Sequence, residues 1–269
     1  MSTWAEKVVV ITGGSAGLGQ VLVSAWAAAG ARVIAVARDA DRLQDSLASL
    51  GPLRDRVSPW TADVTVDDDV QQLFARIQAE CGRLDVLVNN VGRSTRGALI
   101  ETSPADLQRL WELNFLSMVR CTRAAFPLLR ESRGHLVNIG SLASKSAARY
   151  LGGYPATKAA VAAYTQQLRY EWAEWGIHVL LVCPGPLRRE DAGERYAAQA
   201  AGLPAAVSRP GGGVRLRGLD PHWLARRILK DCERRRVECV VPARARLLFA
   251  IQQLCPALGD WILARATRS

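Results

Sequence analysis

The residues with the clearest chemical potential are Tyr154 and Lys158, which lie four positions apart in the run Tyr-Pro-Ala-Thr-Lys. Side chains at positions i and i+4 face the same side of a helix, one turn apart. An ammonium there favours the phenolate, so we expect Lys158 to lower the pKa of Tyr154 toward the working pH. Ser141, thirteen residues upstream, supplies a hydroxyl that can bind the same oxygen. Such a pair also occurs by chance on solvated helix faces, so its meaning depends on the elements that position it.

A glycine-rich turn near the start of the chain predicts a dinucleotide site. The apolar run 7–12 is typical of a buried parallel strand, and an apolar helical pattern runs over 18–29 and stops at Gly30. Strand, glycine turn and helix are the context in which backbone N–H groups and the helix dipole favour a pyrophosphate. The spacing here is Gly-x-x-x-Gly-x-Gly, and a structural glycine turn in another α/β protein is the alternative.

Within this turn each glycine has its own expected purpose. Gly13 can make the tight turn, Gly17 lets the pyrophosphate approach the backbone, and Gly19 lets helix and strand pack closely. We also assign Ser15 and Leu18 to the cofactor site.

The end of the second predicted strand favours NADP(H) over NAD(H). An acidic residue that would hold the ribose 2′-OH of NAD is absent there, because Ala37 and then Arg38 occupy the place. A guanidinium can pair with a 2′-phosphate and stack on adenine. The alternative is that Arg38 points to solvent, and Asp39 and Asp41 lie close by in the sequence.

Further short motifs follow in order: Asp63-Val64, Asn89-Asn90-Val91-Gly92, Asn114 and Pro184-Gly185. Together with the glycine turn, Ser141, Tyr154 and Lys158, they resemble the short-chain dehydrogenase/reductase family over about residues 5–242. The resemblance implies that Tyr154 is the general acid/base, that Lys158 holds the nicotinamide ribose and tunes Tyr154, and that Ser141 orients the substrate oxygen. Asn114 would bind a water on the proton path.

The resemblance also implies a set of cofactor contacts. These are Asp63 and Val64 at the adenine, Asn89 and Gly92 in the channel after the fourth strand, and Pro184 and Gly185 beside the nicotinamide. Two positions depart from the family pattern. Val91 stands where alanine is usual, and Arg189 stands where a threonine often helps to hold the nicotinamide amide.

Length and composition indicate one sizeable α/β core without a second domain over residues 1–269. The six cysteines form no Cys-x-x-Cys and histidine is scarce, so we expect no metal site and a reducing compartment. No apolar signal region precedes the first strand, so secretion is not expected and a cytoplasmic location is favoured.

The net charge of +10 needs a partner hypothesis. No nucleic-acid motif or aromatic-basic array appears, so we expect no nucleic-acid partner. A solvated basic face, an anionic membrane surface and an acidic substrate carrier all remain open. The arginines cluster late in the chain, at 188, 189, 209, 215, 217, 226, 227, 234, 235, 236, 244, 246, 265 and 268.

Apolar strand-like runs alternate with amphipathic segments along the chain. We expect strands near 7–12, 32–37, 57–61, 85–89, 135–140, 177–183 and 237–241. We expect helices near 17–29, 40–50, 67–81, 104–131, 154–174 and 221–235. This order predicts a Rossmann-like, doubly wound parallel α/β sheet of about seven strands, with motifs at the carboxyl ends of four strands converging on one crevice.

Two later segments are expected to shape the substrate site and the surface. Residues 188–218, with a helical piece at 192–201 and glycines at 211–213, suit a substrate lid, disorder without function being the alternative. Residues 243–269 form an amphipathic tail whose apolar stripe suits either a membrane interface or packing on a subunit. The run before Pro256 is too short to span a membrane, which takes about 20 residues.

Apolar residues on the segments 104–131 and 154–174 exceed what the sheet needs, and family members commonly pair these helices. Most of these residues are expected to belong to the core, and the remainder favour a homodimer or homotetramer. The residues concerned are Trp111, Phe115, Met118, Phe126, Val161, Tyr164, Leu168 and Trp172.

The expected function is an NADP(H)-dependent oxidoreductase that transfers a hydride between nicotinamide and a small-molecule carbonyl or secondary alcohol, including lipid-like ketones. No metal is needed, because the Tyr154–Ser141 pair polarises the carbonyl. Two alternatives stay open: a reductase of 3-ketoacyl chains on an acidic carrier, and a nucleotide-binding sensor or scaffold without turnover.

Overall fold

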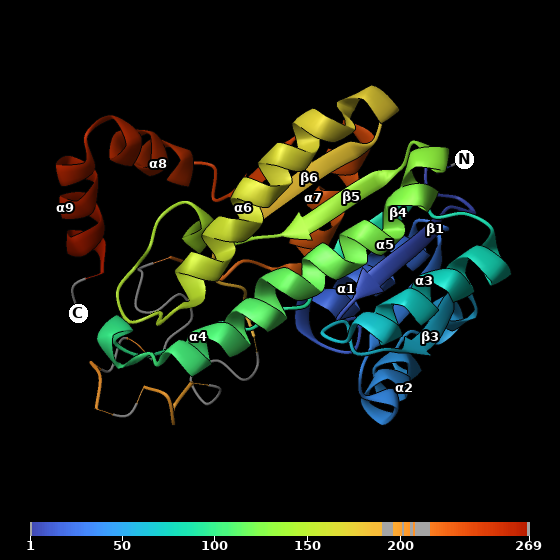
Figure 1. The fold of residues 1–269 in the computed structure, drawn as a ribbon, viewed down its shortest axis with the longest axis horizontal. Coiled ribbons are helices and arrows are strands. Elements are labelled where there is room, and N and C mark those ends of the chain that lie inside the picture. Colours follow the sequence, from blue (N-terminus) through green and yellow to red (C-terminus); the bar gives the residue numbers. More distant parts are fainter. Residues whose placement is uncertain (1, 190–195, 201, 205–206, 208–215, 268–269) are drawn as a thin grey trace.

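The computed structural model describes residues 2–189, 196–200, 202–204, 207 and 216–267. Its centre is one sheet of seven parallel strands in the order β3-β2-β1-β4-β5-β6-β7 (Figure 1). The strands are β1 Val8–Thr12, β2 Arg32–Ala37, β3 Val57–Thr61, β4 Val86–Asn89, β5 His135–Ile139, β6 His178–Pro184 and β7 Glu238–Val241. Each predicted strand is present, with bounds that differ from the predicted ones by at most one residue at either end.

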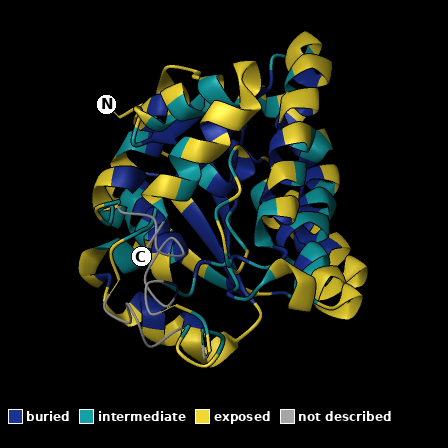
Figure 2. Ribbon diagram, turned by 90° about the vertical axis from the view of Figure 1, so that its left-hand side faces the viewer, coloured by how far each residue is buried: buried dark blue, intermediate teal, exposed yellow. Residues whose placement is uncertain are grey.

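Helices cover both faces of this sheet. The helices of the described chain are α1 Gly17–Ala28, α2 Ala40–Ala48, α3 Asp67–Cys81, α4 Pro104–Trp111, α5 Ser117–Ser132, α6 Tyr154–Glu171, α7 Pro221–Glu233, α8 Ala245–Leu254 and α9 Pro256–Ala266, of which the last two lie beside the sheet. Alternate residues of β1 face opposite layers: Val9 and Ile11 pack with α1, α2 and α7, whereas Val8 and Val10 pack with α3, α5 and α6. Figure 2 shows the buried strands between helices whose outward faces are exposed.

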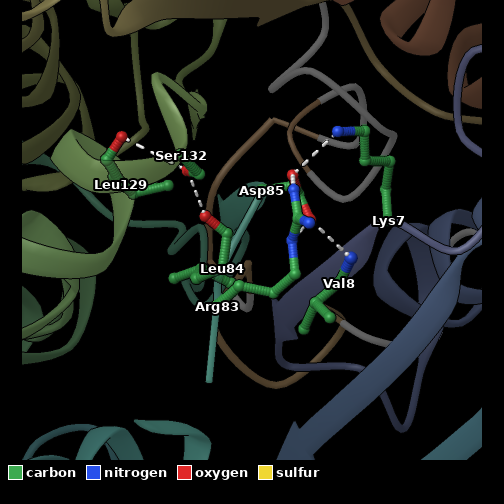
Figure 3. A network of polar contacts seen from close by, with 7 residues as sticks. All are labelled: Lys7, Val8, Arg83, Leu84, Asp85, Leu129 and Ser132. Atoms are coloured by element: carbon green, nitrogen blue, oxygen red, sulfur yellow. Dashed lines mark hydrogen bonds and ion pairs between the residues drawn. The ribbon is translucent and has the colours of Figure 1, made fainter. Parts of the chain in front are cut away.

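A buried carboxylate holds the amino ends of the two central strands together. Asp85, just before β4, accepts hydrogen bonds from the backbone N–H of Val8 at 2.9 Å and from Lys7 Nζ at 3.1 Å (Figure 3). Arg83 Nε donates to the same carboxylate at 2.9 Å. Burial acts to raise the pKa of Asp85, but these hydrogen bonds outweigh it and the pKa is lowered. The network fixes β1 beside β4 and thereby the turn that follows β1.

The predicted single helix 104–131 is interrupted. Between α4 and α5 the chain forms one π-helical turn, η3 Glu112–Leu116. A π-helical turn inserts an extra residue and re-aims the side chains within it, and such turns occur frequently at functional sites. Here the turn carries Asn114. The predicted helix 154–174 likewise ends its α-helical part at Glu171 and continues as a 3-10 turn, η5 Trp172–Trp175.

The amphipathic tail forms two helices, α8 and α9. Pro256 is the first residue of α9, and a proline has no N–H to continue the hydrogen-bond ladder of α8. The two helices pack mainly on each other and stand beside the carboxyl edge of the sheet (Figure 1). Among the described residues, no helix has the length and apolarity needed to cross a bilayer. The lid glycines 211–213 and part of the predicted helical piece 192–201 lie outside the described residues.

Half of the apolar residues assigned to a subunit interface belong to this chain's own core. Met118, Val161, Leu168 and Trp172 are buried. The others are partly buried in aromatic contacts. Phe126 packs on Trp172 with ring centroids 5.0 Å apart, and Phe115 packs edge-on against Tyr164 at 5.7 Å.

Candidate functional site

Three of the predicted catalytic side chains line one cavity of about 730 Å³ at the carboxyl edge of the sheet. Ser141 follows β5, and Tyr154 and Lys158 occupy the first turn of α6. Pro155 sits at the helix start, where its missing N–H has no partner to lose. The predicted spacing of one helical turn therefore aims both side chains at the same space.

Ser141 is held by its own short turn. Its hydroxyl accepts from the N–H of Ala143 at 3.1 Å, and the Ser144 hydroxyl accepts from the N–H of Ser141 at 3.1 Å, a reciprocal capping box. The Ser141 hydroxyl also forms a hydrogen bond with Tyr154 that favours the phenolate. Ser141 is thus preorganised against the tyrosine oxygen.

Lys158 is a buried cation. Its Nζ donates to the carbonyl of Ile139 at 2.8 Å. A Cβ added at Gly92 would lie 3.3 Å from the same Nζ, a tight contact, so glycine lets the loop backbone approach the ammonium without displacing it. Burial lowers the pKa of Lys158 to about 8, which leaves the group mainly protonated at pH 7.

The expected lowering of the Tyr154 pKa is wrong for this structure. Burial dominates and raises the pKa of Tyr154 to about 12, although the hydrogen bond from Ser141 and the charge of Arg96 act in the opposite direction. Desolvation of a phenolate outweighs the nearby cations, and the Lys158 ammonium is directed to the Ile139 carbonyl. Tyr154 therefore holds its proton at neutral pH.

Asn114 ties the loop after β4 to α6. Its Oδ1 accepts from the N–H of Arg93 at 2.7 Å, and its Nδ2 donates to the carbonyl of Arg93 and to Thr157 Oγ1, both at 3.0 Å. Asn114 is almost fully buried and does not line the cavity. It positions the loop that contains Gly92, next to Lys158.

The glycine turn has the geometry that its spacing predicts. Gly13 and Gly17 have φ angles of 68° and 53°, which L side chains rarely adopt. A Cβ added at Gly19 would lie 2.0 Å from the carbonyl oxygen of Gly13, so only glycine allows α1 to pack this closely on the turn. Of this turn, Leu18 lines the cavity, whereas Gly13, Ser15, Gly17 and Gly19 do not.

Arg38 and Asp63 lie at the ends of the neighbouring strands β2 and β3, outside the cavity. Burial acts to raise the pKa of Asp63, but hydrogen bonds from Thr65 and the charge of Arg38 lower it on balance. Asp39 accepts from the N–H of Arg42 at 3.0 Å and caps α2. Val64 is buried in the core.

Asn89 does not line the cavity, contrary to expectation. Its Nδ2 donates to Thr122 Oγ1 at 3.0 Å and to Asn138 Oδ1 at 2.9 Å, inside the protein. Its neighbour Asn90 lines the cavity instead and donates to the carbonyl of Thr12 at 3.0 Å. Successive residues at a strand end point to opposite sides, so the two amides separate.

The remaining wall contains residues that sequence reasoning did not assign. Pro184 and Gly185 line the cavity as expected, and so does Arg189. The tail contributes a mostly apolar side: Ala245, Leu248, Phe249, Trp261, Ile262, Leu263 and Ala266, with Arg244 and Arg265. Of the apolar stripe that the tail sequence shows, Trp261 and Ile262 line the cavity, whereas Leu247, Leu254 and Leu258 are exposed and do not.

Arg96 and Tyr196 form a second unassigned part of the wall. The Arg96 guanidinium lies 3.8 Å from the centroid of the Tyr196 ring, and its Nε donates to the carbonyl of Val207 at 2.9 Å. The backbone N–H of Arg96 donates to Gln199 Oε1 at 3.0 Å. The loop after β4 thereby holds the described part of the segment expected to be a lid.

A separate cluster lies at the opposite edge of the sheet, where β5 and β6 begin. Potential metal-ligating atoms of His135, His178 and Cys232 lie within 4.8 Å of one another. His178 Nε2 donates to the carbonyl of Arg236 at 2.8 Å, so its Nδ1 accepts from His135 Nδ1, at 2.9 Å. Burial lowers the pKa of His135 to about 3 and that of His178 to about 4. The two rings are therefore neutral imidazoles joined by one hydrogen bond.

Comparison with known proteins agrees with this fold. The family model described as short chain dehydrogenase matches residues 7–200. "Ketoacyl reductase HetN" of Nostoc is 28% identical, over 97% of this chain and 90% of its own length. A short-chain dehydrogenase structure from Streptomyces avermitilis is 32% identical, with a TM-score of 0.78 over 100% of both chains.

A structure of L-sorbose reductase from Gluconobacter frateurii, complexed with NADPH and L-sorbose, is also similar. It is 25% identical with a TM-score of 0.77 and covers 90% of this chain and 97% of its own. The seven-stranded fold agrees with these matches. The chain therefore belongs to the short-chain dehydrogenase family of oxidoreductases.

Proposed function

We propose that this oxidoreductase transfers a hydride between NADP(H) and an apolar, lipid-like ketone or the corresponding secondary alcohol. The observation that carries the proposal is one cavity lined by Ser141, Tyr154 and Lys158 on one side and by the apolar residues of α8 and α9 on the other. The first group can polarise and protonate a carbonyl oxygen. The second offers an apolar surface to the rest of the substrate.

The residues present fit a nicotinamide dinucleotide. The turn containing Gly13, Gly17 and Gly19 would hold the diphosphate, and Lys158 the ribose next to the nicotinamide. A Cβ at Gly92 would crowd Lys158 Nζ. The absence of this side chain leaves the loop backbone accessible to the cofactor. Pro184 and Gly185 would lie beside the nicotinamide. When bound, the reduced cofactor supplies the hydride.

Tyr154 acts as the proton donor for carbonyl reduction. Its raised pKa keeps the phenol protonated at pH 7, the form that a donor needs. Ser141 donates a second hydrogen bond to the carbonyl oxygen as negative charge develops there. Lys158 and Asn114 relay the proton that replaces the one lost from Tyr154.

NADP(H) is favoured by the end of β2. Arg38 is exposed there and stands close enough to Asp63 to lower that carboxyl's pKa. The acidic residue next in the chain, Asp39, uses a carboxylate oxygen to cap α2. A 2′-phosphate would meet a guanidinium rather than an opposing carboxylate. Asp63 and Val64 are assigned to the adenine.

Reduction of 3-ketoacyl chains on an acidic carrier is the second candidate. The net charge of +10 and the similarity to a ketoacyl reductase favour it. A sensor or scaffold without turnover would not need Ser141, Tyr154 and Lys158 around one cavity. For assembly we propose a homodimer or homotetramer through α4, α5 and α6. In the tail, Leu247 and Leu254 are exposed and suit contact with a membrane or a subunit.

The test is an NADPH-oxidation assay over short polar ketones, long-chain ketones and 3-ketoacyl chains, free and carrier-bound. The proposal expects turnover of free long-chain ketones, with kcat/KM rising with the length of the apolar chain. Turnover of carrier-bound substrate alone would establish the second candidate. Absence of NADPH oxidation with every substrate would contradict both and favour the non-catalytic alternative.

A further inference from the structure

The side chain of Arg189 crosses the crevice from the end of β6 to the glycine turn. A Cβ added at Gly17 would lie 3.6 Å from Arg189 Nη2 and 3.9 Å from its Cζ. Gly17 is the first residue of α1, so the guanidinium rests against the amino end of that helix. The same side chain lines the cavity that contains Tyr154 and Lys158.

The backbone that leads to Arg189 is anchored. Leu187 forms an isolated parallel bridge with Leu219. Arg188 N–H donates to the carbonyl of Leu219 at 2.8 Å, and Leu219 N–H donates to the carbonyl of Pro186 at 2.8 Å. These bonds hold the strand extension in place, so Arg189 starts from a defined position and its side chain spans the remaining gap.

A cation at this place calls for an anion. The amino end of a helix carries a partial positive charge and outward-pointing N–H groups, which disfavour a guanidinium there. The first turn of α1 contains no acidic residue. Among the described residues that line the cavity, none is an aspartate or a glutamate. A diphosphate bound at the turn would displace the guanidinium from this contact and would accept hydrogen bonds from both groups of donors.

We propose that Arg189 clamps the diphosphate of the bound dinucleotide from the side opposite the glycine turn. This inference rests on the proposed cofactor. The planar guanidinium fork can donate two parallel hydrogen bonds to phosphate oxygens, which a neutral hydroxyl cannot do. The clamp acts on the part that NADPH and NADH share. Its effect is therefore distinct from that of Arg38, which is assigned to the 2′-phosphate.

The test compares dissociation constants, measured by tryptophan fluorescence, for the wild type and the Arg189→Ala, Arg189→Lys and Arg189→Gln variants. The ligands are NADPH, NADH, ADP-ribose, which has the diphosphate, and adenosine 2′-monophosphate, which lacks it. Arg188→Ala is the matched control, because Arg188 is exposed and does not line the cavity. Thermal unfolding without ligand checks that each variant is folded.

Arg189→Ala and Arg189→Gln are expected to raise the dissociation constants of NADPH, NADH and ADP-ribose by about 10- to 150-fold, the range for hydrogen bonds to charged groups. The dissociation constants of the Arg189→Lys variant are expected to lie between those of the wild type and those of the other two variants. Adenosine 2′-monophosphate and the Arg188→Ala control are expected to change less than about twofold.

Unchanged binding of ADP-ribose to folded Arg189 variants would overturn the clamp and leave the proposed function standing. An equal loss of affinity for adenosine 2′-monophosphate would overturn the assignment of Arg189 to the diphosphate. If the wild type binds neither NADPH nor NADH, the proposed function itself fails.

Discussion

Arg38, exposed after β2, is the residue to which we assign the preference for NADP(H). Asp39 accepts from the N–H of Arg42 and Asp63 accepts from Thr65, and the Arg38 guanidinium beside them is the cation that a 2′-phosphate would meet. We expect Arg38→Ala to raise the dissociation constant of NADPH by about 10- to 100-fold and that of NADH by less than about twofold. Fluorescence titration measures both. Arg42→Ala, exposed on α2, is the control, and equal losses for both cofactors would contradict the 2′-phosphate contact.

At the element scale, the histidine pair at the start of β5 and β6 predicts loss of stability in acid. Unfolded histidine titrates near pH 6.5, whereas burial lowers the folded pKa values of His135 and His178 to about 3 and about 4. The unfolded chain binds more protons below pH 6.5. The pair's contribution is therefore complete above that pH and declines as the pH falls toward 4.

We expect the free energy of unfolding to fall by roughly 2 kcal/mol or more between pH 7.5 and pH 5 from this pair. Urea unfolding at several pH values measures it. The double variant His135→Gln, His178→Gln can keep a hydrogen bond without titrating, so its dependence on pH should be flatter. Equal slopes for the wild type and the double variant would contradict the assignment.

Over the whole molecule, the tail closes a cavity that the sheet alone leaves open. Phe249 on α8 lines this cavity, whereas Leu254 on the same helix is 87% exposed and does not. We expect Phe249→Ala to raise KM for long-chain ketones by about tenfold, the value of one buried aromatic ring, and to leave short ketones unchanged. Leu254→Ala should change neither. Equal effects of Phe249→Ala on short and long ketones would contradict a substrate wall.

The sequence was sufficient for the sheet because each buried parallel strand is a continuous apolar run that ends at polar or glycine residues. The sequence also predicted that Tyr154 and Lys158 face the same space, because helical spacing decides which side chains share a face. The π-helical turn at Asn114 was not predictable, since one extra residue hardly disturbs the apolar period. The direction of the Tyr154 pKa depends on burial, which local sequence does not report.

The other parts of the site that could not be predicted depend on contacts between residues far apart in the sequence. Arg189 meets Gly17 only through the order of the strands, and the tail meets the cavity only after two helices fold back from β7. Asn89 and Asn90 are adjacent in the chain, and only the pleat of β4 decides which of the two amides faces the cavity. Each of these depends on tertiary packing.

The central claim is that Tyr154 protonates the carbonyl oxygen beside a bound nicotinamide, and Tyr154→Phe tests it most directly. Steady-state NADPH oxidation with a long-chain ketone, together with NADPH binding, should show kcat reduced by about a thousandfold and a dissociation constant within about twofold of the wild type. Tyr164→Phe, whose ring packs on Phe115, controls for loss of a phenol elsewhere. Turnover retained by Tyr154→Phe would contradict the account.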